Sequence, residues 1–300
     1  MCSSDLTWTP AFQNHLLWLL QRWMDEGGLT GIYHDQFCPH PVTNAITGAA
    51  WLLPDGRVNR GYNLRLDRTY SMREHTLFLE NGIPPRIFCH TTNGGPLICY
   101  PWVTAVLDGE ANMVIANASY DFPDIYPPER MQAYGNPWNW GDTFFWMRLI
   151  QEGDAKWRKA QDRAYQGWTV LHDVMYANGA ESHRAPFFDW GMNDGRVKFW
   201  PYWRSQKVIH TSDPTVLVSM WTLPDRALLC AFNMNKAKTV RADIRLPLQD
   251  LGLMPDVRSE YIRAYDIEGG SVGFDAWAGS LSADVLPHDF RLLVVRKYAQ

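Results

Sequence analysis

The spacing of apolar residues changes once along this chain of 300 residues, near Gly195. Before that point, segments with helical spacing alternate with short apolar runs, a pattern typical of helices packed around a parallel sheet. After it, apolar and polar residues alternate, and turn residues separate the runs at nearly regular intervals. That second pattern is typical of an antiparallel sandwich. The sequence therefore predicts an α/β domain over residues 1–194 and a β-sandwich domain over residues 195–300.

The first predicted helix covers residues 10–26. Thr9 suits its N-cap, Pro10 suits its first position, and the Gly27-Gly28 pair ends it. Two more helices are expected, over residues 62–79 and 155–176. Short buried strands are expected over residues 29–34, 86–89, 102–107 and 144–150, and a long loop over residues 38–61. The strands of the β-rich part are expected over residues 196–203, 215–221, 227–233, 239–246, 261–266 and 290–298.

Composition and charge narrow the range of partners. The formal charge is −4, so no basic surface favours nucleic acid. No apolar run approaches the roughly 20 residues that span a bilayer, so no membrane partner is expected. The five cysteines form neither a C-x-x-C pair nor a zinc-binding spacing, and no metal or other cofactor is predicted.

Tryptophan is abundant, at 15 residues, and aromatic residues reach 14% of the chain. Indole faces stack on the C–H faces of sugar rings and on cations, but they also fill hydrophobic cores. A carbohydrate-binding use and a core-filling use are therefore both open. Trp102, Trp138 and Trp140 are the candidates for stacking on a sugar, although the last two could equally order their own loop.

Polar side chains follow the predicted strands of the α/β part at the point where each strand ends. Asp35 follows the first strand, His90 the second, and Asp108 and Glu110 the third. Because the carboxyl ends of parallel strands open into one mouth, we expect these side chains to lie close together. His34 alternates with Asp35 along the strand and is expected to face the other way.

Each of these residues also has an ordinary structural explanation. Asp35 could be a turn former, Asp-Gly-Glu is a frequent turn sequence, and His90 could organise the loop that follows it. His172 and Asp173, in the predicted helix over residues 155–176, are expected to be structural. The functional hypothesis depends on the joint placement at successive strand ends.

A pair of carboxyl groups at such a mouth suits the cleavage of glycosidic bonds. Asp108 and Glu110 are two residues apart, so an extended backbone places both on one face, and Gly109 between them leaves room for a ligand. One carboxyl group can then stay protonated while another stays charged. We expect Glu110 to be the general acid/base and Asp35 the nucleophile or electrostatic stabiliser, with Asp108 and His90 binding the sugar.

Several segments resemble the C-terminal half of bacterial barrel glycoside hydrolases, in a group related to glycoside hydrolase family 123. They are GIYHDQF (31–37), GYNLRLDRTYSMRE (61–74), the strand ending at His90, LDGE (107–110), LHDV (171–174) and FWPYW (199–203). The resemblance implies the C-terminal part of a (β/α)8 barrel followed by a C-terminal antiparallel β-sandwich domain, with a carbohydrate substrate at the barrel mouth. Family 123 uses adjacent Asp and Glu, whereas the only such pair here, Asp25-Glu26, ends a helix. We do not transfer the family roles to that pair.

The resemblance also implies that about four barrel strands lie upstream. Residues 1–6, MCSSDL, match the translation of a common sequencing-adapter end and are expected not to be native. The chain would then be part of a longer protein, and an upstream signal peptide would direct it to the periplasm or outside the cell. If the catalytic carboxylates lie upstream, then Asp35, Asp108 and Glu110 would bind substrate instead.

Two other function classes are possible on the sequence alone. The first is a noncatalytic carbohydrate-binding protein, or a degenerate barrel that kept the mouth without the chemistry. The second is a metal-dependent hydrolase that uses His34, Asp35 and His90. It fits less well, because neighbouring residues of a strand face opposite ways and no H-x-H or H-E-x-x-H spacing is present.

Overall fold

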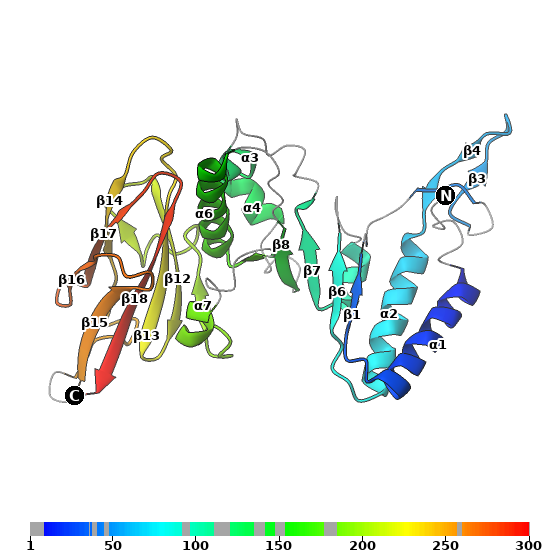
Figure 1. Ribbon diagram of the computed structural model, residues 1–300, viewed down its shortest axis with the longest axis horizontal. Helices are drawn as coiled ribbons and strands as arrows, with labels where there is room; N and C mark the ends of the chain where they lie inside the picture. The colour runs from blue at the N-terminus through cyan, green and yellow to red at the C-terminus, as the bar shows by residue number, and fades with distance from the viewer. Residues whose placement is uncertain are drawn as a thin grey trace. The chain divides into compact units, whose positions relative to one another are not determined.

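The computed structural model describes residues 9–35, 37, 41–44, 48–91, 97–110, 121–134, 142–147, 154–176, 185–256 and 260–299. The chain forms two compact units (Figure 1). The first consists of Met1–Asn112 and Pro137–Met147, and the second of Met113–Asn136 and Arg148–Gln300. The predicted boundary between residues 194 and 195 falls inside the second unit. The predicted boundary marks the change of sequence pattern, whereas the two units are defined by contacts between residues. The boundary stays a prediction.

The first unit contains a parallel sheet. Its strands are β1 (Ile32–His34), β6 (Ile87–His90), β7 (Ala105–Asp108) and β8 (Thr143–Trp146), paired in that order. His34 lies opposite Cys89, and His90 lies opposite Leu107. The carboxyl ends of these strands therefore lie at one edge of the sheet. This confirms the α/β part with its parallel strands, and within the described residues β1 is an end of this sheet.

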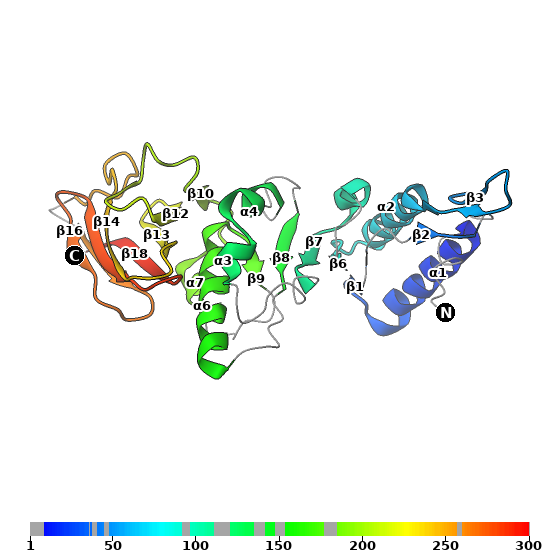
Figure 2. The same ribbon diagram turned by 90° about the horizontal axis from the view of Figure 1, so that it is seen from above.

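Two long helices, α1 (Pro10–Gly27) and α2 (Leu64–Glu80), pack side by side in the first unit (Figure 2). The Thr9 side chain accepts a hydrogen bond from the amide of Phe12, and Gly28 ends α1 in the left-handed conformation at φ 65°. The first predicted helix is therefore confirmed together with its caps. None of the helices among the described residues combines the length and apolarity needed to cross a membrane.

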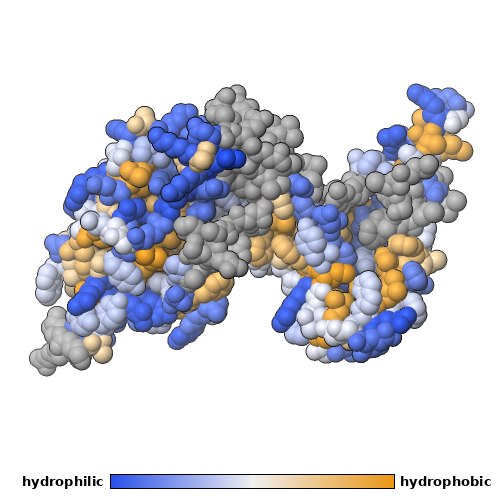
Figure 3. Space-filling model, in the orientation of Figure 1, coloured by the Kyte–Doolittle hydropathy of each residue, from blue (hydrophilic) through white to orange (hydrophobic). Residues whose placement is uncertain are grey.

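The predicted loop over residues 38–61 contains four short strands instead. They are β2 (Pro41–Val42) paired with β5 (Gly61–Tyr62), and β3 (Trp51–Leu52) paired with β4 (Val58–Asn59). A Cβ on Gly61 would lie 1.8 Å from the carbonyl oxygen of Ala49, so this glycine permits a close backbone approach. The β3–β4 hairpin exposes the apolar side chains of Trp51, Leu52 and Val58 (Figure 3).

The strand predicted over residues 102–107 begins later than expected. A 3-10 helix, η3 (Leu97–Trp102), occupies its start, and β7 follows at Ala105. Pro101 lies inside η3, and because proline has no amide proton it could not complete a strand ladder there.

The second unit begins with helices: α3 (Phe122–Ile125), α4 (Pro128–Tyr134), α6 (Ala155–Leu171) and α7 (Ala185–Trp190), with a short strand β9 (Met175–Tyr176) after α6. The helix predicted to reach residue 176 ends at Leu171, with His172 as its cap. Asp173 has φ 58°, which cannot continue a helix. The Ser219 hydroxyl donates to the carbonyl of Leu171 over 2.7 Å, so the end of α6 is held by the neighbouring sheet.

Two antiparallel sheets complete the second unit. One contains β10 (Lys198–Trp200), β12 (Val216–Leu223), β13 (Arg226–Asn233), β18 (Phe290–Ala299) and β15 (Glu260–Asp266), and the other contains β11 (His210–Thr211), β14 (Val240–Arg245), β17 (Ser280–Val285) and β16 (Gly273–Asp275). Their inward side chains form one hydrophobic core. All six predicted strands of this part are present. The sequence analysis missed β11, β16 and β17, which are short or rich in small polar residues.

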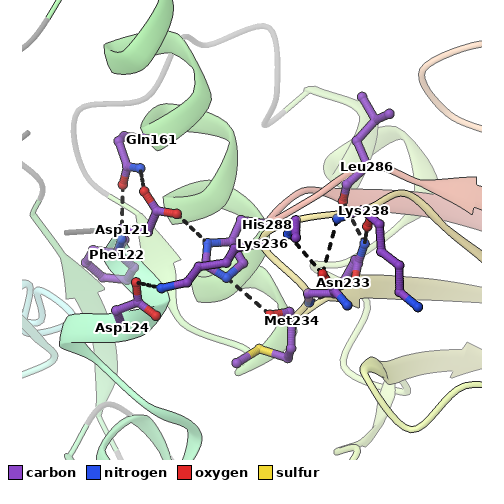
Figure 4. A network of polar contacts seen from close by, with 12 residues as sticks. Asp121, Phe122, Asp124, Gln161, Asn233, Met234, Lys236, Lys238, Leu286 and His288 are labelled. Atoms are coloured by element: carbon purple, nitrogen blue, oxygen red, sulfur yellow. Dashed lines mark hydrogen bonds and ion pairs between the residues drawn. The ribbon is translucent and has the colours of Figure 1, made fainter. Parts of the chain in front are cut away.

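A polar network ties the helices of the second unit to its sheets (Figure 4). Nδ1 of His288 lies 2.7 Å from Oδ2 of Asp121, and Nε2 lies 3.2 Å from the carbonyl oxygen of Met234. The Gln161 amide donates to Asp121 and accepts from the amide of Phe122. The two ring nitrogens of His288 thus link Asp121 to the backbone at Met234.

Candidate active site

Three of the predicted site residues meet at the carboxyl ends of β1, β6 and β7. Nδ1 of His90 lies 2.8 Å from Oδ1 of Asp35, and Nε2 lies 3.3 Å from Oε2 of Glu110. The His90 side chain is 4% exposed, whereas those of Asp35 and Glu110 are 66% and 34% exposed. A buried imidazole therefore lies between two carboxyl groups that solvent can reach.

The register of the parallel sheet explains this convergence. His34 lies opposite Cys89, so the next residues along the two strands, Asp35 and His90, lie at the same level of the sheet. Adjacent strands are about 4.8 Å apart, which is within the combined reach of the two side chains. The amide of Phe37 donates to the carbonyl of His90, which holds the chain beyond Asp35 against β6.

Counting protons shows what this cluster can do. Carboxylate oxygens only accept hydrogen bonds, so two ionised carboxylates around His90 require a proton on each ring nitrogen. Moving the proton on Nε2 to Glu110 leaves a neutral imidazole that still donates from Nδ1 to Asp35. Both states hold two protons. The cluster can therefore present a protonated Glu110 together with an ionised Asp35, and His90 can hold the proton in between.

Tyr33 belongs to the same face, although the sequence analysis did not select it. Its ring stacks at 6.4 Å between centroids on the ring of His90. Partial burial raises the pKa of Tyr33, and the nearby negative charges of Asp35 and Glu110 raise it further. The signal was present in the sequence, because strand alternation places Tyr33 on the same side as Asp35.

Asp108 is buried, and it makes a hydrogen bond to the next residue along the chain. Its Oδ1 accepts the amide of Gly109 at 2.6 Å. Gly109 has φ +105°, and a Cβ there would lie 2.3 Å from the carbonyl oxygen of Met147 and 2.8 Å from Nε1 of Trp146. The expectation that Gly109 leaves room for a ligand is therefore wrong, because protein atoms fill that space. A substrate contact by Asp108 stays a prediction.

The structure places Trp102 away from the cluster of Asp35, His90 and Glu110. It lies before the amino end of β7, and the four residues of that strand separate it by about 13 Å from the carboxyl end. Its carbonyl contacts Nδ1 of His75 at 3.1 Å, so it packs against α2. Trp138 and Trp140 lie outside the described residues. A stacking role for the three tryptophans stays a prediction.

His34 faces α2, as the alternation predicts. Its Nε2 lies 2.8 Å from Oε2 of Glu74, whose other oxygen accepts the hydroxyl of Tyr70 at 3.1 Å. The metal-dependent hypothesis needs His34 beside Asp35 and His90, and the structure does not bring His34 to that side. In the described part of the chain, no group of three or more His, Cys, Asp or Glu side chains is arranged to hold a metal ion.

His172 and Asp173 have structural contacts in the second unit, as expected. Nδ1 of His172 lies 2.7 Å from the carbonyl oxygen of Trp168, and burial lowers the pKa of His172 to about 4. Asp173 accepts Nε1–H of Trp221 at 3.0 Å, and burial raises its pKa to about 6. The neutral His172 ring therefore anchors the end of α6.

Comparison with known proteins gives a fold and no sequence family. No protein-family model matches the sequence, and no curated protein matches it. Among solved structures, the α-amylase of Geobacillus thermoleovorans in complex with acarbose has a TM-score of 0.55 at 9% identity, covering 97% of this chain and 65% of that chain. The trehalose-6-phosphate hydrolase of Bacillus licheniformis has a TM-score of 0.53 at 9% identity, covering 96% and 69%.

This chain has a glycoside hydrolase-like fold. At such low identity the likeness concerns the fold alone, and the chain spans about two thirds of each of these two structures. A family 30 subfamily 8 xylanase from Clostridium acetobutylicum also matches, with a TM-score of 0.45 at 9% identity over 96% of this chain and 73% of that chain. The comparisons do not support the closer relation to family 123.

Proposed function

We propose that this protein is a glycoside hydrolase that cleaves glycosidic bonds of an oligo- or polysaccharide with two carboxyl groups. Glu110 is the general acid/base, and Asp35 is the nucleophile or electrostatic stabiliser. The observation that carries the proposal is the His90 ring between Asp35 and Glu110 at adjacent strand ends. The likeness of the fold to an α-amylase and a trehalose-6-phosphate hydrolase supports it.

The reaction needs the two carboxyl groups in opposite protonation states, and the hydrogen-bond geometry around His90 is compatible with such a pair. An acid must give a proton to the departing sugar oxygen, while the other group must stay negative beside the forming oxocarbenium ion. Nδ1 of His90 lies 2.8 Å from Oδ1 of Asp35 and can donate a hydrogen bond to it. Glu110 can receive the proton from Nε2. Because the imidazole is nearly buried, it orients both groups without competing for the sugar.

The finer architecture belongs to the same proposal. We infer that the parallel strands β1, β6, β7 and β8 are the C-terminal part of a (β/α)8 barrel, and that the two antiparallel sheets form a C-terminal β-sandwich. In barrel enzymes the site lies at the carboxyl ends of the strands, which is where Asp35, His90 and Glu110 meet. The substrate, a carbohydrate, would lie over that edge.

A substrate panel with matched variants tests the activity. Release of reducing sugar is measured from starch, xylan and β-glucan, and release of nitrophenol from small chromogenic glycosides. Glu110→Gln and Asp35→Asn should each lower kcat by about 100-fold to 10,000-fold on the substrate that is cleaved. Asp55→Asn is the control, because among the described residues Asp55 pairs with nearby Arg57 alone, on an exposed turn.

Two results would contradict the proposal. Wild-type protein that binds a polysaccharide but releases no sugar would favour a noncatalytic binding protein instead. Full activity in Glu110→Gln would remove Glu110 from the reaction. Azide added to Asp35→Ala is expected to restore turnover if Asp35 is a nucleophile, by attacking the anomeric carbon directly and leaving an inverted glycosyl azide; the anomer released by the wild type reports whether configuration is retained.

A further inference from the structure

The outer face of the four-stranded sheet of the second unit carries a hollow that is distant in sequence from the strand-end cluster. Its volume is about 630 Å³, and the side chains around it are mainly polar and charged. This size is within the range of about 300 to 1,000 Å³ that is usual for small-ligand sites. The polar side chains used below are His210, Asp243, Arg245, Asp275, Ser280 and Ser282.

Strand alternation produces this face. On β14, Ala242 and Ile244 point into the core, so Asp243 and Arg245 point outward. On β17, Leu281 enters the core, and its neighbours Ser280 and Ser282 point outward. Charged and hydroxyl groups therefore alternate with core residues along two adjacent, well-paired strands.

The register aligns the polar groups in rows across the strands. His210 lies opposite Arg245, Arg245 opposite Ser280, and Ser280 opposite Asp275. Four strands at about 4.8 Å spacing give a row about 14 Å long, which suits a short chain of sugar rings. In the neighbouring row Asp243 lies opposite Ser282, which lies opposite Gly273.

Gly273 lies in the wall of this hollow, where it has no side chain to fill the space. A Cβ on Gly273 would lie 2.4 Å from Oγ of Ser282, so any larger residue would push into the hollow or displace β17. Oγ of Ser282 accepts from Arg241 at 2.9 Å, which leaves its proton available for a ligand.

The charged side chains of the hollow can still form hydrogen bonds with a ligand. Among the described residues, no hydrogen bond or ion pair engages the side chains of Asp243 and Arg245. The guanidinium of Arg245, together with that of Arg241 at Ser282, balances the two carboxylates of Asp243 and Asp275, so the local charge is small. A strongly anionic ligand is therefore disfavoured. A neutral ligand with many hydroxyl groups could bond to both the donor and the acceptors.

An exposed indole lies beside the hollow. Trp277 is 80% exposed, the highest exposure of any large hydrophobic side chain in the described residues. It lies in the turn between β16 and β17, whose flanking residues Asp275 and Ser280 line the hollow. Oδ1 of Asp275 accepts the amides of Trp277 and Ala278 at 2.9 and 3.0 Å, so the turn that presents the indole is held in place.

We propose that this sheet face is a second, noncatalytic site that binds a neutral carbohydrate chain. Trp277 stacks on one sugar ring, and Asp243 and Arg245 bond to hydroxyl groups along the row. The polar rows alone would suit a merely solvated sheet face. The features that indicate a ligand are the hollow, the absence of a side chain at Gly273 and the exposed indole of Trp277. This site does not depend on hydrolysis at Glu110.

Affinity electrophoresis of the full chain tests the proposal. Native gels contain xylan, starch or β-glucan, or the anionic polygalacturonate as a comparison. We expect at least one neutral polysaccharide to retard the wild-type protein. Trp277→Ala and Arg245→Ala should each weaken that retardation about tenfold in apparent affinity. Trp18→Ala is the matched control, because Trp18 is 53% exposed on α1, and it should leave the retardation unchanged.

Three outcomes would overturn the proposal: no retardation by any neutral polysaccharide, equal retardation of Trp277→Ala and Arg245→Ala with the wild type, or retardation by polygalacturonate alone. Thermal melting establishes that both variants are folded, which is expected because both side chains are exposed. Hydrolysis of a small chromogenic glycoside separates the two proposals. Trp277→Ala should keep the wild-type rate, and Glu110→Gln should keep the retardation, so either site can fail while the other stands.

Discussion

Two histidines, one in each unit, have each ring nitrogen facing a hydrogen-bond acceptor, but the acceptors differ. His90 lies between two carboxyl groups, Asp35 and Glu110. His288 lies between one carboxylate, Asp121, and the backbone carbonyl of Met234. A carboxylate can take a proton from the ring, whereas a peptide carbonyl cannot at ordinary pH. The His90 ring therefore has a carboxyl group on each side, between which a proton can pass, whereas the His288 ring has a carboxyl group on one side only.

Exposure strengthens the same contrast. Glu110 and Asp35 are exposed to solvent, so small molecules can reach the two carboxyl groups beside His90. His288 joins segments of the second unit that are 167 residues apart, and its partner Asp121 is also bonded by Gln161. The two imidazoles thus differ in their partners and in the access of water to those partners: His90 lies beside carboxyl groups that solvent can reach, and His288 links distant segments of the second unit.

The largest expected effect is on His90→Gln. Glutamine can still hydrogen-bond to Asp35, but it cannot carry a proton to Glu110. We expect kcat/KM to fall by about 100-fold to 10,000-fold, and the limb of the pH–rate profile that reports the proton of the cluster to move. Steady-state kinetics across pH on the substrate found in the panel provide the measurement.

His75→Gln is the matched control for His90→Gln, because among the described residues the His75 ring contacts the backbone carbonyl and the indole of Trp102 and no carboxyl group. It should leave the pH–rate profile in place. A wild-type pH–rate profile in His90→Gln would show that His90 does not pass a proton between Asp35 and Glu110.

The second-largest effect is expected from His288→Asn, which should lower the free energy of unfolding and leave activity intact. Asparagine tolerates the positive φ of 45° at this position, so the backbone is not the cause of the loss. Breaking the partly buried contact with Asp121 should cost about 2 kcal/mol of unfolding free energy. Urea unfolding near pH 6 measures it, and unchanged kinetics on a small glycoside complete the contrast. An unchanged urea midpoint would argue against a stabilising role for His288.

The smallest effect is the pH dependence of that contribution. The hydrogen bond from His288 lowers the pKa of Asp121 against the opposing effect of burial. A carboxyl group whose pKa is lowered by folding adds stability that is complete above its ordinary pKa near 4 and is lost as the pH falls through the folded value. The stability difference between wild type and Asp121→Asn should therefore shrink below about pH 4. A difference that grows with acidity would contradict this sign.

Much of the fold follows from local patterns. Thr9, Pro10 and Gly28 predict the ends of α1, because caps act within one turn of a helix. The strand ends at Asp35 and His90 were predictable because apolar runs stop there and parallel strands share one edge. Less local features were missed. The β2–β5 and β3–β4 pairs lie in a Gly- and Pro-rich stretch where propensity predicts a loop, and pairing between distant segments decides otherwise.

In the candidate site too, features set by neighbouring residues were predictable, and features set by distant segments were not. Strand alternation separates His34 from Asp35, and the structure confirms that separation. The space beside Gly109 was not predictable, because the carbonyl of Met147 that fills it comes from another strand. The partner of His288 was not predictable either, because Asp121 lies far away in the sequence.

By itself, the sequence determined the change from an α/β part to a β-rich part, the capped first helix and the strand ends that carry Asp35, His90 and Glu110. These depend on periodicity and on residues a few positions apart. Only the tertiary structure decided which ring nitrogen meets which acceptor, and therefore which histidine can pass on a proton. That depends on the register between strands and on contacts between segments far apart in the chain, which residue order does not encode locally.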